Sequence, residues 1–433
     1  MNKKLSLFQI ILLGVMVVII VAGVIVFAAQ KSKNQQVSAP VKIWGTLPAE
    51  AIAQFQEEMN SLEKNSVNII YQEFDEGVFE QELIEALASD TAPDAVFLTD
   101  DTLLKHENKL FLIGYDYYTQ KQFKDNFIEA SEVLLREDGL LGFPIAINPL
   151  VLYWNRTILN NEGITASPKY WDDFLSLVPR IVKKDSKGNI SRSAVAFGEY
   201  DNIKSAKDIL LSLIQQAGNN VIFRDPVKKK YYSALSDQFG FTLRPADTAL
   251  NFYAQFSNPT KDVYSWNKAM PNSEEAFIAG DLAFYFGFAD ERRQLLQKNP
   301  NLNFDVSVLP QSRSSIANST IGKMQFAAIL SRSQNISNAF TTLVKITSPE
   351  AIKILSNVLQ IAPVRRDIDE NFSSLSYMDV FRRSALISKI FLDPDREETD
   401  NIFKKMIESV VSGFQNVSAA VDRASAELLT LFE

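Results

Sequence analysis

Side chains suited to covalent catalysis or metal binding are scarce in this sequence. Cysteine is absent and His106 is the only histidine among 433 residues. This excludes disulfides, thiolate nucleophiles, cysteine-based zinc sites and histidine-based catalytic triads. The G-x-S-x-G, H-E-x-x-H and G-x-x-x-x-G-K-[ST] motifs are also missing. The 52 acidic residues leave one enzymatic option open, because a glycoside hydrolase needs only two carboxylates about 5 to 10 Å apart. We therefore expect no cofactor and no metal site, and few routes to catalysis remain.

Candidate binding side chains follow two of the predicted strands. Trp44 ends the first strand, Val41 to Trp44, and Asp100 and Asp101 follow the third, Ala95 to Thr99. An aromatic plate together with short polar side chains suits a small ligand that has both flat apolar faces and polar groups. Trp44 has an alternative role as a core residue, and either aspartate has one as a helix cap. We expect Trp44 and at least one of the two aspartates to line a ligand site.

The elements that position these residues alternate between strands and amphipathic helices. They are a strand at Val41 to Trp44, a helix near Pro48 to Lys64, a strand at Val67 to Tyr71, a helix at Val78 to Ala88 and a strand at Ala95 to Thr99. This order predicts an α/β fold with a parallel open sheet covered by helices on both faces. Such sheets bind ligands beyond the carboxyl ends of their strands. The chain is also too long for a single core, which predicts two lobes.

The overall charge bears on the partner. A net charge of -8 and a pI near 5.1 make a nucleic-acid partner unexpected, because neutralising phosphates requires a basic face. The run Lys228 to Lys230 beside two tyrosines is instead typical of an exposed hairpin.

The N-terminal segment predicts membrane attachment. The twenty residues from Ile10 to Ala29 contain no charged side chain and would span about 30 Å as a helix, the thickness of a bilayer's hydrocarbon core. A cleaved signal peptide is the alternative, since Ala28 offers a small residue for cleavage, but its apolar region is usually about 7 to 15 residues long. We predict a cytoplasmic N-terminus at 1-9, a single transmembrane signal anchor at 10-29 and a flexible linker at 30-40. Lysines flank the apolar run on both sides, so charge does not decide its orientation.

Four motifs in order carry a family resemblance. They are Asp138 to Phe174 with its Asn155-Arg156 and Trp171-Asp172-Asp173, Phe277 to Gln311 with Gly280, Gly287 and Leu309-Pro310, Phe326 to Arg366 with Thr347-Ser348-Pro349, and Ala92-Pro93-Asp94. Together they resemble the extracellular solute-binding proteins of ABC importers, in the carbohydrate-type group that includes maltose-binding protein. The resemblance covers essentially all of Val41 to Glu433.

This resemblance implies a two-lobed periplasmic-binding-protein-like fold of type II with a ligand cleft between discontinuous lobes. The chain would cross between lobes near Ile147 to Leu150, Ile321 to Gln325 and Asp367 to Ser376. Lobe 1 would comprise about 41-147 and 325-367, and lobe 2 about 151-321 and 376-433, within a solute-binding domain at 41-433. Such lobes close by a hinge motion.

The resemblance also implies ligand contacts at Asn148 and at Phe288, with Asp290 as a polar alternative, and we expect a further contact at Gln325. The family commonly has an acidic residue where this chain has Asn148, and tryptophan or tyrosine on the loop that here reads Phe288-Ala289-Asp290. An aromatic residue of maltose-type members is replaced around Asp400-Asn401. These departures argue against assuming maltose as the ligand. Trp171, by contrast, packs the lobe in the family.

The implied function is that of a membrane-anchored, single-pass receptor with its C-terminal domain outside the cytoplasm. As a monomer it would bind a carbohydrate or similar polar small molecule and deliver it to ABC permease subunits. Outward display of the domain rests on the resemblance. Two alternatives are a sensor subunit that presents its ligand to a signalling receptor and a surface glycoside hydrolase on the same scaffold.

Overall fold

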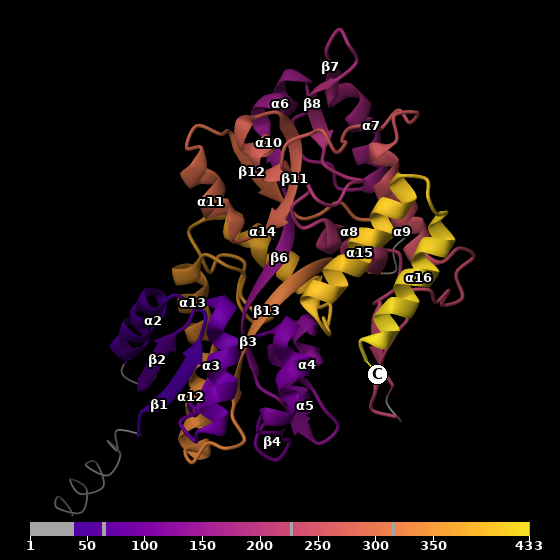
Figure 1. The fold of residues 1–433 in the computed structure, drawn as a ribbon. Coiled ribbons are helices and arrows are strands. Elements are labelled where there is room, and N and C mark those ends of the chain that lie inside the picture. The colour runs from indigo at the N-terminus through magenta and orange to yellow at the C-terminus, as the bar shows by residue number, and fades with distance from the viewer. Residues whose placement is uncertain (1–38, 63–65, 226–227, 314–316, 433) are drawn as a thin grey trace, which may run out of the picture.

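A single mixed sheet runs through the whole molecule (Figure 1). The computed structural model describes residues 39–62, 66–225, 228–313 and 317–432. Within these residues the sheet has the strand order β2-β1-β3-β13-β6-β11-β8-β7, with β12 beside β6 and β14 beside β13. The predicted membrane segment 10-29 and the flanking 1-9 lie outside the described residues, as does most of the predicted linker 30-40. In the described ranges, no helix combines the length and apolar character needed to cross a membrane.

The elements gather into two lobes. In Figure 1 the lower lobe contains β1 (Val41–Gly45), α2 (Ala49–Ser61), β2 (Ile69–Glu73), α3 (Glu76–Ala88), β3 (Ala95–Thr99), α4 (Leu103–His106), β4 (Ile113–Gly114), α5 (Gln120–Asn126), β5 (Gly139–Leu140), α12 (Ile336–Ile346) and α13 (Pro349–Leu359). Short 3-10 helices at Asp100–Thr102, Glu107–Lys109 and Glu129–Leu134 complete it. Strands β2, β1 and β3 are parallel, as the alternation of strands and helices predicts.

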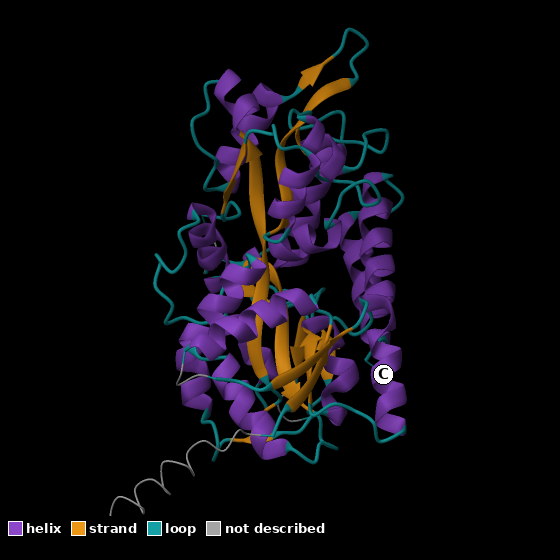
Figure 2. Ribbon diagram, turned by 90° about the vertical axis from the view of Figure 1, so that its left-hand side faces the viewer, coloured by secondary structure: helices purple, strands orange, loops and turns teal. Residues whose placement is uncertain are grey.

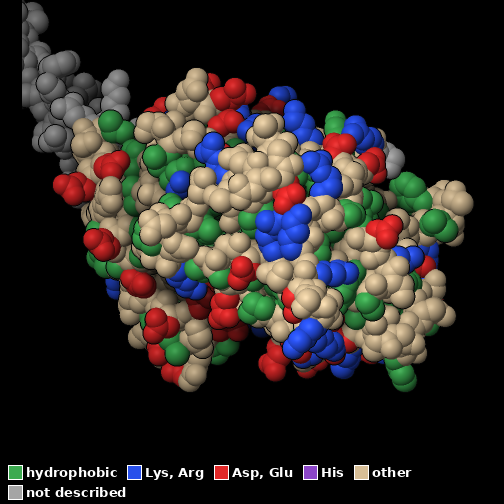
Figure 3. All heavy atoms as spheres, turned by 90° about the horizontal axis from the view of Figure 1, so that it is seen from above, with side chains coloured by type: hydrophobic (Ala, Val, Ile, Leu, Met, Phe, Trp, Pro, Cys, Tyr) green, Lys and Arg blue, Asp and Glu red, His purple; other side chains and the backbone are tan. Residues whose placement is uncertain are grey.

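The upper lobe contains most of the remaining elements. These are α6 (Arg156–Asn161), α7 (Trp171–Ile181), β7 (Lys183–Lys184), β8 (Ile190–Val195), α8 (Ala206–Gln216), β9 (Ile222–Arg224), β10 (Tyr231–Ser233), α9 (Pro245–Ala254), a 3-10 helix at Gln255–Ser257, α10 (Ser273–Ala279), β11 (Leu282–Phe288), α11 (Glu291–Lys298), β12 (Phe304–Ser307), α14 (Ser376–Leu386), β14 (Ser388–Lys389), α15 (Arg396–Val411) and α16 (Val417–Thr430). On the face seen from above, basic and acidic side chains are intermixed (Figure 3).

Two long strands are shared by both lobes. β6 (Phe143–Asn155) pairs with β13 (Thr320–Ile329) through residues up to Pro149, and with β11 and β12 from Leu150 onward. β13 pairs with β14 at Thr320 and Ile321 and with β3 from Gln325 onward. Figure 2 shows the strands passing from one lobe to the other between helices on either side. The two strands change partners where the sequence predicts the first two chain crossings; the exact lobe bounds stay a prediction.

Burial explains why these strands form. Every residue of β6 is buried except Asn148, and all of β11 is buried. Continuous apolar runs of this kind are typical of strands covered on both faces. The apolar run at 150–154 is evident in the sequence, but the strand that contains it begins earlier, at Phe143. The predicted hairpin around Lys228 to Lys230 is confirmed by antiparallel pairing of β9 with β10.

Trp171 anchors the core of the upper lobe. Its ring contacts those of Phe174, Phe252 and Phe286 with centroids 5.3 to 5.9 Å apart, and its indole Nε1 donates to Gln216 Oε1 at 2.7 Å. A buried ring with its one donor satisfied is a structural residue. This agrees with the packing role implied by the resemblance.

Trp171→Ala should therefore lower the free energy of unfolding by about 3 to 5 kcal/mol, through lost burial and a residual cavity. Denaturant unfolding of the full chain measures this loss. Phe414→Ala is the matched control, because Phe414 is 80% exposed and its truncation should change stability by no more than about 0.5 kcal/mol. Equal effects of the two substitutions would contradict the packing role.

Candidate ligand-binding site

Strand register brings polar side chains together on one face at the crossing. Lys323 lies directly opposite Asn148, and Gln325 lies opposite Thr99. Phe288 pairs with Leu150, two residues from Asn148, and so lies on the same face. We call these five residues, Thr99, Gln325, Lys323, Asn148 and Phe288, the hinge stripe. Along β13 only Lys323 and Gln325 are not fully buried, so the stripe is where the shared strands leave the core.

Lys323 covers the aromatic ring of the stripe. Its ammonium nitrogen lies 4.1 Å from the centroid of the Phe288 ring, a cation–π distance. The same nitrogen lies 3.5 Å from the Asp208 carboxylate at the start of α8. Phe288 is only 4% exposed. The Phe288 ring, which the resemblance implies as a ligand contact, is therefore covered by Lys323 in this conformation. The exposed group at this position is the Lys323 ammonium.

The amides of the stripe differ in how well they are paired. The side-chain Oδ1 of Asn148 accepts a hydrogen bond of 3.1 Å from the backbone N–H of Asp290, whose own side chain is exposed. Gln325 is half-buried, and its Oε1 is shielded from water without a donor among the described residues. An unpaired buried acceptor costs about 1 to 3 kcal/mol. Gln325 thus holds an acceptor ready for a donor from outside the chain.

Asp100 is bonded to the backbone of β13 at Met324, next to Gln325. Its Oδ1 accepts from the backbone N–H of Met324 at 2.5 Å, and the residue is 6% exposed. Burial, reinforced by the neighbouring Asp101 carboxylate, raises the pKa of Asp100 well above its usual range. Asp100 therefore ties the end of β3 to the crossing strand and is a structural group.

Asp101 faces the upper lobe instead. Its carboxylate accepts from the Thr99 hydroxyl and lies 3.9 Å from the guanidinium of Arg396 at the start of α15. Four residues on, Asp400 pairs at 2.5 Å with Lys207, which also bonds Asp393 at 3.0 Å. Burial alone would lower the pKa of Lys207, but these carboxylates hold it above its ordinary value. The start of α15 thus presents charged groups toward the lower lobe.

Trp44 stands apart from the stripe. It is half-buried at the end of β1, and its ring lies 4.7 Å from that of Phe74. In the parallel pairing it lies opposite Val96, on the other face from Thr99. Among the described contacts, none joins Trp44 to another predicted site residue. The structure therefore groups Asn148, Phe288, Asp290 and Gln325, and leaves Trp44 on the lower-lobe edge. Asp101 joins the group only through the Thr99 hydroxyl.

The arrangement suits hydrogen bonding rather than covalent chemistry. In the described part of the chain, no cluster of three or more His, Asp or Glu side chains has metal-binding geometry. His106 is buried, and burial together with nearby Lys109 and Lys105 lowers its pKa to about 4, which keeps the ring neutral. The stripe instead offers an ammonium, an amide and a free acceptor side by side.

The sequence matches a known family over residues 50–377, described as bacterial extracellular solute-binding protein. That match covers about three quarters of the chain. The chain belongs to this family. Its members are binding proteins, which agrees with the absence of catalytic motifs from the sequence.

Solved structures of low sequence identity share the fold of this solute-binding protein. The cyclic alpha-maltosyl-1,6-maltose binding protein from Arthrobacter globiformis aligns with a TM-score of 0.75 at 14% identity, over 91% of this chain and 99% of that one. The sugar-binding protein MalE from Xanthomonas citri gives 0.72 at 19% identity, over 91% and 97%. The GacH receptor of Streptomyces glaucescens gives 0.65 at 15% identity, over 92% and 99%. No curated protein sequence matches significantly.

Sequence reasoning missed three charged residues of this solute-binding protein's crossing region: Lys323, Asp208 and Arg396. Lys323 had a detectable signal, since it is a single cation inside the apolar run from Thr320 to Ile329. Asp208 and Arg396 had no such signal in the sequence. Each is a charged residue at the start of a helix, and only the fold places these helices at the crossing.

The buried Asp100 makes a pH-dependent contribution to stability. Because its pKa is raised on folding, the folded state holds the proton more tightly than the unfolded state does. Its contribution is complete below the unfolded pKa of about 3.9 and is lost as the pH rises above it. Asp100→Asn keeps an acceptor for Met324 and does not titrate.

The melting temperature of the Asp100→Asn variant should therefore rise relative to wild type as the pH increases from acidic to neutral. Asp290→Asn is the control, because it removes one exposed carboxylate at a site that Asp100 does not touch. Parallel melting curves for wild type and Asp100→Asn across this range would contradict a protonated Asp100 in the folded protein.

Proposed function

We propose that this chain is a membrane-anchored extracytoplasmic receptor that captures a carbohydrate or a similarly polar small molecule between its lobes and delivers it to an ABC permease. Membership of the extracellular solute-binding family supports capture of a small molecule. Delivery to a permease is what such membership implies. Genes for two permease subunits beside this one would favour transport over a sensing role.

The observation that carries the proposal is the free acceptor on the hinge stripe. Gln325 Oε1 has no donor among the described residues, and the Lys323 ammonium makes no hydrogen bond to Asp208, only a charge contact at 3.5 Å. A ligand that both donates and accepts would satisfy both groups, and a hydroxyl does so with one atom. Polyhydroxy compounds are the small molecules richest in such groups.

Two further features favour a carbohydrate. The fold neighbours are described as binding a cyclic maltosyl-maltose, acarbose or sugar. Trp44 and Phe74 form an aromatic pair at the lower-lobe edge, which suits the apolar face of a sugar ring. Lys323 over Phe288, and Asp400 paired with Lys207, put charges where maltose-type members carry aromatic side chains. We therefore propose a ligand more polar than maltose.

Gln325→Leu should separate ligand binding from folding. It removes an unpaired buried acceptor, so the ligand-free protein should be as stable as wild type or slightly more stable. The same change should remove most of the ligand-induced rise in melting temperature. A thermal-shift screen of the full chain in detergent, against mono- and oligosaccharides, polyols and amino acids, first identifies the ligand. At about 100 times its dissociation constant, a ligand adds roughly 2.7 kcal/mol of stability.

Trp44→Ala gives the companion measurement. It should weaken binding of the identified sugar while lowering ligand-free stability far less than Trp171→Ala does. A screen with no response to any sugar would overturn the carbohydrate proposal. Release of a shortened product from an oligosaccharide would replace it with the glycoside hydrolase alternative.

Attachment to the membrane is a separate prediction. Twenty apolar residues exceed the core of a signal peptide, and the chain has no cysteine for lipidation. The mature protein should therefore remain in the membrane fraction after high-salt and carbonate washing, with its N-terminus intact. N-terminal sequencing checks this. A mature chain that begins near Ala29 or Gln30 would contradict the anchor.

A further inference from the structure

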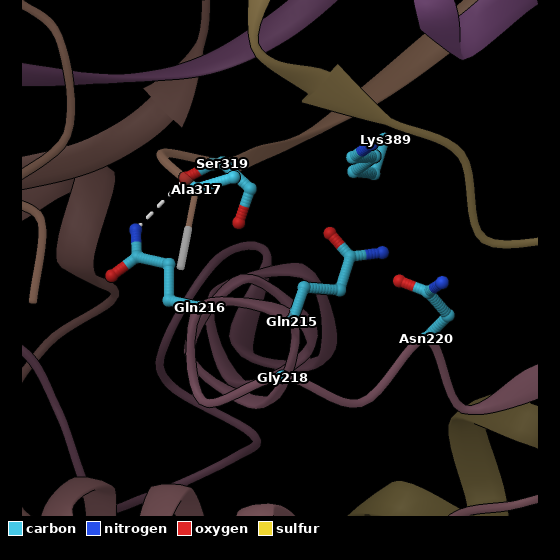
Figure 4. A pocket seen from close by; sticks show the side chains of 7 residues that line it. All are labelled: Gln215, Gln216, Gly218, Asn220, Ala317, Ser319 and Lys389. Carbon is cyan, nitrogen blue, oxygen red and sulfur yellow. Dashed lines mark hydrogen bonds between the residues drawn. The ribbon is translucent and has the colours of Figure 1, made fainter. Parts of the chain in front are cut away.

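A polar cavity lies away from the hinge stripe, where α8 ends. It has a volume of about 140 Å³ and is lined by Gln215, Gln216, Gly218, Asn220, Ala317, Ser319 and Lys389 (Figure 4). These residues come from the end of α8, the loop after it, the residues before β13, and β14. A single water needs only about 10 to 15 Å³, so the cavity has room for several waters or one small compound. Gly218 and Asn220 are exposed, which leaves it accessible from solvent.

Buried polar atoms without partners converge on this cavity. Both amide atoms of Gln215 and the hydroxyl of Ser319 are shielded from solvent and make no hydrogen bond among the described residues. Gln215 is only 8% exposed, and Figure 4 shows its amide directed into the space between Ser319 and Asn220. Unsatisfied buried polar groups are rare in native proteins, because each costs about 1 to 3 kcal/mol. Several at one cavity indicate a bound partner.

The adjacent Gln216 shows that this cluster is not a general feature of the helix end. Its Oε1 accepts from Trp171, and its Nε2 donates to the carbonyls of Pro310 at 3.2 Å and Ser319 at 2.9 Å. Gln216 is thus a structural glutamine with its hydrogen bonds made inside the protein. Gln215, one residue earlier, presents the same functional group to the cavity with none made. The two neighbours therefore have different roles.

The lining selects the class of occupant. Two carboxamides and a hydroxyl both donate and accept, which matches hydroxyl groups. The cation, Lys389, is already paired with Glu129 of the lower lobe, so the lining has no uncompensated charge to attract an ion. Among the described residues, no aromatic side chain lines the cavity, so the flat face of a pyranose would find no plate there. A short, neutral and flexible polyol fits these three conditions.

We propose that this cavity is a second binding site, separate from the hinge stripe, for a small neutral polyol of about three to five carbons. The polyol hydroxyls bond the Gln215 amide, the Ser319 hydroxyl and the Asn220 amide. Contact with Lys389 places the polyol beside an ion pair that joins the two lobes. This site does not depend on the identity of the ligand between the lobes.

Erythritol is the probe, with the full chain in detergent. Polyols stabilise all proteins through exclusion from the surface, but that effect rises steadily with concentration, whereas binding saturates. Wild type should show a saturating rise in melting temperature at millimolar erythritol above the steady background. Equilibrium dialysis with radiolabelled erythritol should give one molecule per chain.

Three variants test whether erythritol binds in this cavity. Gln215→Leu, Ser319→Ala and Asn220→Ala should each weaken erythritol binding by about tenfold, the value of one or two lost hydrogen bonds. Asn220 is exposed, so its variant should fold even if Gln215→Leu does not. Trp44→Ala should leave the erythritol response intact, which separates this site from the proposed carbohydrate site. A response that never saturates, or one unchanged in all three variants, would mean that the cavity holds only water or that erythritol binds elsewhere.

Discussion

The antiparallel pairing of β6 with β13 is the constraint on which the rest of this molecule depends. Both strands belong to both lobes, and the pairing between them runs from the lower lobe, at Phe143 and Ala327, up to the crossing, at Pro149 and Gly322. β6 is buried along its length apart from Asn148, and a shift of one residue would move every one of its packed side chains to the other face. The pairing is therefore fixed, and the relative position of the lobes follows from a few residues at the crossing. Hinge motions in two-lobed proteins are absorbed at such points.

The same pairing decides which polar groups meet. Because directly opposite residues share a face, Lys323 must lie beside Asn148 and Gln325 beside Thr99. An irregularity between Gln325 and Phe326 falls where β13 passes from the crossing into the lower lobe. The extra residue is Ile145 of β6, and bulges are common beside functional sites. Gln325, on the partner strand, is half-buried with its side-chain Oε1 unpaired among the described residues.

Much of the fold was predictable because it rests on local pattern. β3 begins and ends at the predicted residues Ala95 and Thr99, since an apolar run between a Pro-Asp turn and two aspartates has clear ends. The candidate site was harder to predict from the sequence. Phe288 could be named as a candidate from its position in the family motif, but the sequence gives no sign that Lys323 covers its ring. Asp100 and Asp101 are equivalent in sequence, and only the fold turns one inward to Met324 and the other toward Arg396. Local sequence pattern does not give the register between distant strands, and this register places the side chains of the site.

Strand β13 also explains how the two polar regions of the protein are related. Ser319, which lines the cavity at the end of α8, immediately precedes β13. Lys323 and Gln325 lie further along the strand, on the hinge stripe. Between them, the Thr320 hydroxyl donates to the Leu150 carbonyl at 2.8 Å, and Ser212 of α8 accepts from the Ile321 amide at 3.1 Å. These bonds hold the start of β13 to both β6 and α8. Gln216 of α8 also donates to the Ser319 carbonyl at 2.9 Å, so Ser319, the start of β13 and the end of α8 are held together. Lys323 and Gln325 lie beyond these bonds, at the crossing, where hinge motions are absorbed.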